Sequence, residues 1–432
     1  MPSHSTFSEY SARLREFISR QSGGGSAAPS SVTAETSGQF NQLALTLFAL
    51  QFYHVPVYRR YCEARGITPE NTTAWSEIPA IPAAAFKECA LSSLSPAERT
   101  TVFHSSGTTT HKPSRHFHNH ESLEVYEASL LPWFQRHVLP EVQFRFIILT
   151  PGPALAPHSS LVHMFETVRR EFAPNDSMFV GSLHDHEIAH RDPEVGKDAF
   201  HRVPRISGSR PEKVRDGVES VPTGVMESAN ADGGWILETD QAWAALTHAA
   251  SDDRPVVLLG TAFSFVELLD WMIGKQLRLS LPPGSRALET GGYKGRSRAL
   301  PKAELHGLIT DRLGIRSTHI VCEYGMSELS SQAYDRVAGA PPFQISNLKF
   351  EMHRTFRFPP WAQVQIVSPE TGKAVDDGET GLIRIYDLAN VRSVMAIQTE
   401  DLGIRRGEGF ELVGRAAFSE PRGCSLMSTA AP

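Results

Sequence analysis

Apolar residues follow two kinds of spacing along the first 340 positions of the chain. One kind repeats every three to four residues and predicts helices, which we expect over residues 7–20, from residue 40, and over 122–138, 161–170 and 264–273. The other kind is a short run typical of a strand, at residues 101–103, 144–150, 256–260, 287–289 and 318–322, and the nearly continuous apolar run at 144–150 suits a strand buried on both faces. Because these strands alternate with helices, the pattern predicts an α/β fold with a largely parallel sheet.

The pattern changes after about residue 341, where two alternating runs at 363–367 and 381–386 flank a turn-rich segment. This arrangement predicts a small antiparallel sheet or barrel appended to the α/β body. Near the amino terminus, the stretch QSGGGSAAPSS has the composition of a flexible linker. We therefore expect a helix over residues 1–20, a linker over 21–38, the α/β body over 39–340, the β-rich subdomain over 341–415 and a tail over 416–432.

Composition narrows the class of protein. The chain has 432 residues, 41% of them hydrophobic and 21% charged, as expected for a large globular protein, and its net charge of −6 argues against a nucleic-acid partner. The amino terminus has no apolar segment typical of a signal peptide, and the longest apolar stretch, residues 256–274, contains two carboxylates, so no membrane span is expected. The four cysteines show neither disulfide density nor paired metal spacing, so we expect free thiols and a cytoplasmic location.

A hydroxyl-rich loop, SSGTTTHK at residues 105–112, follows the apolar run at 101–103. Glycine at 107 lets backbone N–H groups approach a phosphate closely, while the hydroxyls add donors and Lys112 adds a positive charge. The loop therefore predicts a phosphate-binding site, although an ordinary polar loop explains this run equally well when it is taken alone.

Further candidate segments also follow predicted strands, where ligands of open α/β sheets bind. They are TGGYKG at 290–295, EYGMSE at 323–328, TEDLG at 399–403 and the pair Gly414-Arg415. The glycine pair allows a flat ring to lie against the backbone, although a tight turn is the simpler interpretation. Glu328 is a candidate ligand for Mg²⁺, and Asp401 is a candidate acceptor for a ribose diol.

In this order the segments resemble the adenylate-forming superfamily of acyl-CoA synthetases, luciferases and peptide-synthetase adenylation domains. The closer resemblance is to the LuxE-type acyl-protein synthetases. It also uses IPAIP at 78–82 with Phe86-Lys87, YDLAN at 386–390, QTEDLG at 398–403 and RGCSL at 422–426. The resemblance covers residues 40–426.

The resemblance implies that a fatty or other carboxylic acid reacts with ATP, giving acyl-AMP, and that the acyl group then moves to a thiol. It implies an adenylating body with a small β-subdomain, and ATP and Mg²⁺ as cofactors. Catalytic roles fall on Cys424, Glu328 and Lys112, and Glu328 is the metal ligand. The implied ATP contacts are Ser105, Ser106, Gly107, Thr108, Thr109 and Lys112 to the phosphates, Gly291, Gly292 and Tyr324 to adenine, Ser327 to the α-phosphate, and Asp401 and Arg415 to the ribose.

Two departures from the superfamily pattern matter. Thr110 stands where a glycine is usual, and Lys112 precedes Pro113 instead of following a proline. Typical superfamily members also carry a mobile carboxy-terminal domain with a catalytic lysine, which we do not expect after Arg415. LuxE-type proteins use a cysteine near the carboxy terminus as acyl acceptor, and Cys424 lies in the matching place.

Three alternatives stay open. In the first, the acyl group is delivered to coenzyme A or to a carrier-protein phosphopantetheine, whereas an acyl-accepting reductase is the family's own type of partner. In the second, the chain is a non-catalytic subunit that binds acyl groups or nucleotides. In the third, Cys424 is a small residue in a mobile terminus. The segment HDHEIAH at 184–190 is interpreted as a solvated loop, and Cys322 as an inert core thiol.

Overall fold

A computed structural model describes residues 5–23, 34–105, 112–139, 144–183, 235–292, 298–340 and 354–416. Within these ranges the largest sheet has six strands in the order β11-β10-β9-β8-β4-β5. All neighbours in it run parallel except β11, which pairs antiparallel with β10. This confirms the predicted α/β class. The strands are β4 (Arg145–Ile148), β5 (Ser177–Phe179), β8 (Val256–Thr261), β9 (Arg286–Thr290), β10 (Ile320–Tyr324) and β11 (Ala333–Tyr334).

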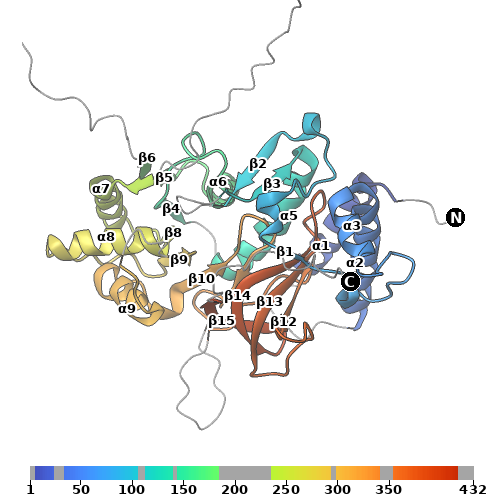
Figure 1. The fold of residues 1–432 in the computed structure, drawn as a ribbon. Coiled ribbons are helices and arrows are strands. Elements are labelled where there is room, and N and C mark those ends of the chain that lie inside the picture. The colour runs from blue at the N-terminus through green and yellow to red at the C-terminus, as the bar shows by residue number, and fades with distance from the viewer. Residues whose placement is uncertain are drawn as a thin grey trace, which may run out of the picture.

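Helices cover both faces of this sheet, because its strands are apolar on both sides (Figure 1). Alternate residues of β4 divide between two cores, with Phe146 and Ile148 in one and Ile147 in the other. The first core contains α5 (His120–Val138) and α6 (Ser160–Phe172), and the second contains α7 (Thr239–Ala250), α8 (Ala262–Gly274) and α9 (Lys302–Leu313). Among the helices of the described ranges, none has the length and apolar character needed to cross a membrane.

A second sheet confirms the predicted change of architecture near the carboxy terminus. It comprises β12 (Ala362–Val367), β13 (Thr380–Asp387), β14 (Ala396–Arg406) and β15 (Gly409–Arg415), all paired antiparallel, and β1 (Ile81–Pro82). Strand β1 pairs parallel with β14 through Ile81 and Ile397. The sheet therefore takes one strand from the part of the chain that we assigned to the α/β body.

The strand predicted at residues 101–103 is present, but it does not belong to the largely parallel sheet that we expected. It forms β2 (Thr101–His104), which pairs antiparallel with β3 (Arg115–His118) in a separate two-stranded sheet. The hydroxyl-rich segment is thus the connection of a hairpin and does not follow a strand of the parallel sheet. Strand β6 (Gly181–Leu183) pairs antiparallel with β7 (Trp235–Leu237) in another two-stranded sheet.

Three helices at the amino terminus pack beside the second sheet (Figure 1). They are α1 (Phe7–Ser22), α2 (Ala34–His54) and α3 (Pro56–Glu63), and short helical turns include α4 (Ala85–Glu88). A capping box between Thr6 and Glu9 begins α1. The Tyr10 hydroxyl of α1 donates to the Leu388 carbonyl at 3.2 Å. Helix α2 begins at Ala34, so residues 34–38 are helical and do not belong to a linker.

Buried hydrogen bonds join the two sheets. The Asp387 carboxylate at the end of β13 accepts from the Ser330 N–H at 2.8 Å and from the Ser331 hydroxyl at 2.7 Å. Burial raises the pKa of Asp387, and these hydrogen bonds act in the opposite direction. The indole of Trp361 donates to the Ser129 hydroxyl of α5 at 2.7 Å. The Asp387 contacts hold the segment after β10 against the β-rich sheet, and the Trp361 contact holds α5 against it.

Candidate active site

The hairpin β2–β3 closes the base of the hydroxyl-rich loop. The Ser105 N–H donates to the Ser114 carbonyl at 3.3 Å, and the Ser114 N–H donates to the Ser105 hydroxyl at 3.0 Å. Ser105 therefore fixes the two ends of the loop to each other, and Lys112 is exposed beside them. Ser106, Gly107, Thr108 and Thr109 lie outside the described residues, so their phosphate contacts stay predictions.

Tyr324 and Asp401, predicted to bind adenine and ribose, lie in direct contact. Tyr324 ends β10, and its hydroxyl donates to the Asp401 carboxylate on β14 at 2.8 Å. The rings of Phe356, Phe358 and Phe410 meet the tyrosine ring edge-on, with centroids 5.2–6.3 Å away. The pair thus joins the end of the parallel sheet to the centre of the second sheet.

Arg415 is the third member of this group. It pairs with Asp401 in the register of β14 and β15, and its Nε lies 3.7 Å from the Asp401 carboxylate. Its side chain is 80% exposed, so the ion pair is weak and the guanidinium is free to move toward a ligand.

Ser327 connects the segment after β10 to the base of the hydroxyl-rich loop. Its hydroxyl donates to the His104 carbonyl of β2 at 3.1 Å and accepts from the Ser160 hydroxyl of α6 at 3.3 Å. Its own carbonyl lies 3.0 Å from His116 Nδ1 of β3. Burial lowers the pKa of His116 to about 4, so the ring is neutral at physiological pH and Nδ1 carries the proton donated to this carbonyl.

Glu328 is a carboxylate almost without solvent exposure. Its side chain is 6% exposed, and its carbonyl accepts from the Asn390 amide at 2.9 Å. Burial raises the pKa of Glu328, while the Ser114 hydroxyl and the charges of Lys87 and Arg415 act in the opposite direction. A buried carboxylate with a neighbouring hydroxyl is a donor set that suits Mg²⁺, a hard cation that prefers oxygen ligands.

Two glycines follow β9 at the edge of the sheet where Tyr324 lies. Gly291 has φ +66°, a left-handed conformation that favours glycine, and Gly292 follows it. Both are exposed, and a Cβ placed on either would meet no atom within 4 Å. The backbone there is open to a flat ligand, as the predicted adenine contact requires.

Glu323 lies in the candidate site, but its burial and its raised pKa were not predicted from the sequence. Its side chain is buried and contacts the Thr290 hydroxyl. Burial raises the pKa of Glu323 to about 7, and the neighbouring charge of Glu289 adds to this shift, whereas Thr290 and Lys302 oppose it. A Cβ at position 325 would overlap the Glu323 carboxylate, which explains the glycine there.

His116 and Ser160 were missed as well. In RHFH at 115–118 the two histidines are buried while Phe117 is half-buried, so apolar alternation does not identify His116 as a buried residue. Ser160 reaches the site only through tertiary packing, whereas Asn390 belongs to the YDLAN segment at 386–390. Cys424 and the segment 184–190 lie outside the described residues.

Comparison with known proteins finds a family match over part of the chain. Residues 226–431 match the family model described as acyl-protein synthetase, LuxE. A curated relative, the long-chain-fatty-acid–luciferin-component ligase of Aliivibrio fischeri, is 24% identical over 186 residues. The alignment covers 40% of this chain and 45% of the relative, so it spans less than half the length of either. These findings confirm the resemblance that the sequence motifs predicted.

Solved structures of 2-hydroxyisobutyryl-CoA ligase share the fold. The open conformation with 2-HIB-AMP and CoA has a TM-score of 0.53 and 10% identity, and covers 91% of this chain and 80% of the ligase. The postadenylation state with 2-HIB-AMP has a TM-score of 0.55 and 10% identity, with 91% and 72% covered. At this identity the likeness concerns the fold alone, which is that of adenylate-forming enzymes.

Proposed function

We propose that this chain, which matches the LuxE acyl-protein synthetases over residues 226–431 and has the fold of adenylate-forming enzymes, activates a carboxylic acid with ATP and passes the acyl group to a thiol. One observation carries the proposal: the hairpin β2–β3, the end of β10 and strand β14 converge through the Ser327–His104 and Tyr324–Asp401 hydrogen bonds. The segments proposed to bind phosphate, adenine and ribose lie far apart in the sequence. These hydrogen bonds bring them together, so that one nucleotide could contact all of them.

The proposed reaction has two steps. A carboxylate oxygen of the acid attacks the α-phosphorus of ATP, the bond to the pyrophosphate oxygen breaks, and acyl-AMP forms. The acceptor thiol loses its proton to solvent, the resulting thiolate sulfur attacks the acyl carbonyl carbon, the bond to the AMP oxygen breaks, and AMP leaves. The acid would be a fatty acid, as the name of the Aliivibrio fischeri relative suggests.

The chain's own residues would position the nucleotide. Asp401 would accept hydrogen bonds from the ribose hydroxyls, with Arg415 beside it, and the Tyr324 ring and the glycine pair would flank the adenine. Ser105 would hold the hydroxyl-rich loop in a conformation that presents N–H groups and Lys112 to the phosphates. Glu328 would hold Mg²⁺, which supplies positive charge against the phosphate oxygens. Most of the rate enhancement would then come from positioning and charge stabilisation.

Cys424 is the proposed first acyl acceptor. A thiol near its ordinary pKa of about 8.5 is only a few per cent ionised at neutral pH, and the charge of Arg422 would favour the reactive thiolate. The acyl group would then pass to a reductase or a carrier protein.

Two assays test the proposal. ATP–pyrophosphate exchange with a panel of acids should show acid-dependent exchange, and its absence with every acid would favour a non-catalytic binding subunit. Incubation with ATP, Mg²⁺ and the best acid should add one acyl mass to the intact protein through a hydroxylamine-labile bond.

The variant Cys424→Ala should keep the exchange activity and lose the acyl adduct. Cys89→Ala, which removes a thiol that is only partly buried, is the matched control and should keep both. Acylation that persists in Cys424→Ala would assign the acceptor to another cysteine. Acyl-CoA formation without any protein adduct would favour coenzyme A as the acceptor.

A further inference from the structure

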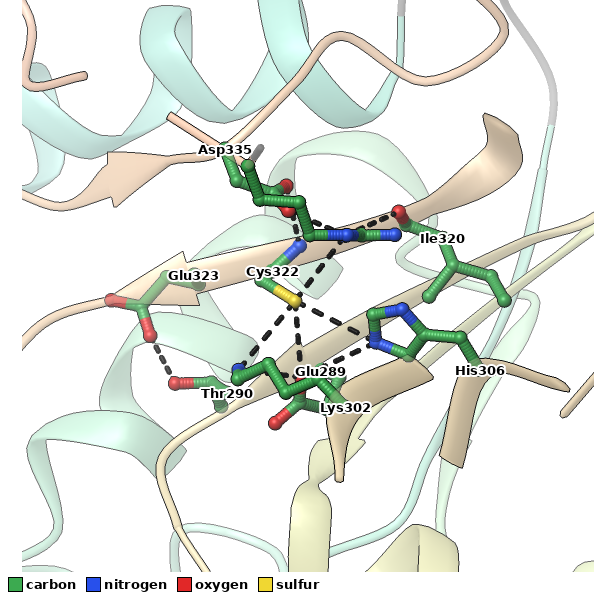
Figure 2. Close-up of polar contacts among 9 residues, drawn as sticks. Glu289, Thr290, Lys302, His306, Ile320, Cys322, Glu323 and Asp335 are labelled. Carbon is green, nitrogen blue, oxygen red and sulfur yellow. Dashed lines mark hydrogen bonds and ion pairs between the residues drawn. The ribbon is translucent and has the colours of Figure 1, made fainter. Parts of the chain in front are cut away.

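We propose that Glu289, His306 and Cys322 form a binding site for Zn²⁺ behind the candidate nucleotide site, independent of the proposed function. Figure 2 shows the three side chains pointing toward one another from β9, α9 and β10. Their ligand atoms, one oxygen, one nitrogen and one sulfur, all lie within 4.8 Å of one another. Carboxylate, imidazole and thiolate are the three side-chain ligands that Zn²⁺ takes in proteins.

The distances between these atoms match one face of a zinc tetrahedron. Cys322 Sγ lies 3.1 Å from Glu289 Oε2 and 3.7 Å from His306 Nε2, and the nitrogen lies 3.6 Å from the oxygen. Zinc bonds of ordinary length at tetrahedral angles give about 3.5, 3.6 and 3.3 Å for these three pairs. Each atom therefore needs to move by only a few tenths of an ångström to coordinate one ion.

The backbone already holds the three ligands in place. Cys322 and Glu289 are direct neighbours in the register of the parallel strands β10 and β9, so the sheet sets their separation. His306 presents its Nε2 from the buried face of α9. The exposed fractions of Glu289, Cys322 and His306 are 0%, 0% and 5%. Such a site is pre-formed and screened from water.

One atom of the cluster is left without a partner. Glu289 Oε1 is buried and has no hydrogen-bond partner among the described residues, although Oε2 has three contacts. A buried carboxylate oxygen without a partner is costly. A second bond to the same metal ion, or a water on that ion, would satisfy it.

Lys302 is the competing cation. Its Nζ lies 3.0 Å from Glu289 Oε2 and 3.6 Å from Cys322 Sγ, distances that fit the fourth corner of the tetrahedron. Its side chain is 41% exposed, so it can withdraw to solvent and leave that corner to a water molecule. With Lys302 withdrawn, Zn²⁺ balances the charges of Glu289 and a Cys322 thiolate, so the buried charges sum to zero.

A second layer of residues suits a metal-bound thiolate. Arg354 Nη1 lies 3.4 Å from Cys322 Sγ and is paired with Asp335, which also accepts from the Cys322 N–H at 2.8 Å. Donors around a coordinating sulfur, fixed by their own partners, orient such ligands in metal sites. The rival explanation is a closed network in which the Lys302 ammonium, with no metal ion, neutralises Glu289, and it predicts no metal binding.

Zinc content tests the proposal directly. The full-length protein, equilibrated with buffered free Zn²⁺ and freed of excess metal by gel filtration, should hold one zinc ion per chain. The double variant Cys322→Ser, His306→Ala should bind zinc at least about a hundredfold more weakly. Cys89→Ser and Cys424→Ser are matched controls that each remove a thiol outside the cluster, and both should keep the zinc.

A charge variant separates the two explanations even if the double variant fails to fold. Lys302→Leu removes the competing cation and keeps the bulk, so zinc affinity should rise by at least roughly tenfold. With Co²⁺ in place of zinc, a thiolate-to-cobalt absorption band should appear in the wild type and in Lys302→Leu, and be absent from Cys322→Ser. A folded wild type and Lys302→Leu that both lack zinc, or a cobalt–thiolate band that survives in Cys322→Ser, would overturn the proposal.

Discussion

At the scale of single residues, the site depends on carboxylates held away from water. Glu323, Glu328 and Asp387 are all buried, and burial raises the pKa of each. Specific hydrogen-bond donors stabilise each of these carboxylates. The site is therefore sensitive to small steric and charge changes. Three predictions belong to this scale.

The first concerns the glycine beside Glu323. Gly325→Ala should lower the free energy of unfolding by about 1–3 kcal/mol, because the new methyl group overlaps the Glu323 carboxylate and forces it to move. Gly292→Ala is the control, since a Cβ there meets no atom within 4 Å. Urea unfolding of both variants measures the difference, and equal stability of the two would mean that Glu323 shifts at no cost.

The second concerns Glu328, the proposed Mg²⁺ ligand. Glu328→Gln should require more Mg²⁺ for half-maximal pyrophosphate exchange, because a neutral amide is a poorer ligand for a hard cation than a carboxylate. Glu370→Gln, which changes an exposed carboxylate in a turn of the second sheet, should leave the Mg²⁺ dependence as in the wild type. An unchanged requirement in Glu328→Gln would remove Glu328 from the metal site.

The third concerns pH. His137 is buried on α5, its Nδ1 lies 2.9 Å from the Trp133 carbonyl, and burial lowers its pKa to about 4. An unfolded histidine titrates near 6.5, so between about pH 4 and 6.5 the unfolded chain binds the extra proton and stability rises with pH.

The pH-dependent gain from this one group is roughly 3 kcal/mol between pH 4 and 7. His137→Gln should flatten the rise of the unfolding free energy by up to that amount, whereas the exposed His248→Gln should not. Denaturant titrations at several pH values measure both slopes, and identical slopes for wild type and His137→Gln would contradict the assignment.

At the scale of elements, the sequence predicted those strands that are formed by continuous apolar runs. The buried strands β4, β8, β9 and β10 were predicted because burial on both faces leaves a run of apolar residues. Helices α6 and α8 were predicted as well, whereas α7 and α9 were not. Strand β1 has only two residues, Ile81 and Pro82, and such a strand leaves no periodic signal. The pairing of β2 with β3 was missed because the partner strand, RHFH, is not apolar.

The same limits apply to the candidate site. The contact between Tyr324 and Asp401 follows the family order of motifs, although 77 positions separate the two residues. The Glu289–His306–Cys322 cluster has no recognisable ligand spacing, because a helix and two strands supply one residue each. Cys322 was taken for an inert core thiol on the strength of its strand, and its polar neighbours became visible only through tertiary packing.

Helix α1 offers the prediction at this scale. Leu14 lies on its buried face with 0% exposure, so Leu14→Ala should lower the free energy of unfolding by about 2–5 kcal/mol through lost burial and a cavity. Arg20→Ala, which breaks an exposed ion pair with Glu16 on the same helix, should change it by no more than about 1 kcal/mol. Thermal or urea unfolding that fails to separate the two variants would mean that α1 is not part of the cooperative fold.

At the scale of the whole molecule, both sheets contribute to the candidate nucleotide site, so a ligand there should stabilise them together. ATP at a hundred times its Kd should add about 2.7 kcal/mol to the unfolding free energy and raise the Tm. Asp401→Ala should lose much of this gain at the same ATP concentration, whereas Glu370→Ala should retain it. A Tm that does not respond to ATP in the wild type would contradict nucleotide binding at this place.

Because residues near the two ends of the chain contact each other, part of the fold can form only late in synthesis. The Tyr10–Leu388 hydrogen bond spans 378 positions, and the Gln51 side chain donates to the Asn390 carbonyl and accepts from the Met395 N–H. A ribosome adds roughly 5–20 residues per second, so the first helices wait tens of seconds for the strands that cover them. During that time their apolar faces stay uncovered on the nascent chain. Chaperone capture is therefore most valuable to this protein before translation reaches the last strands.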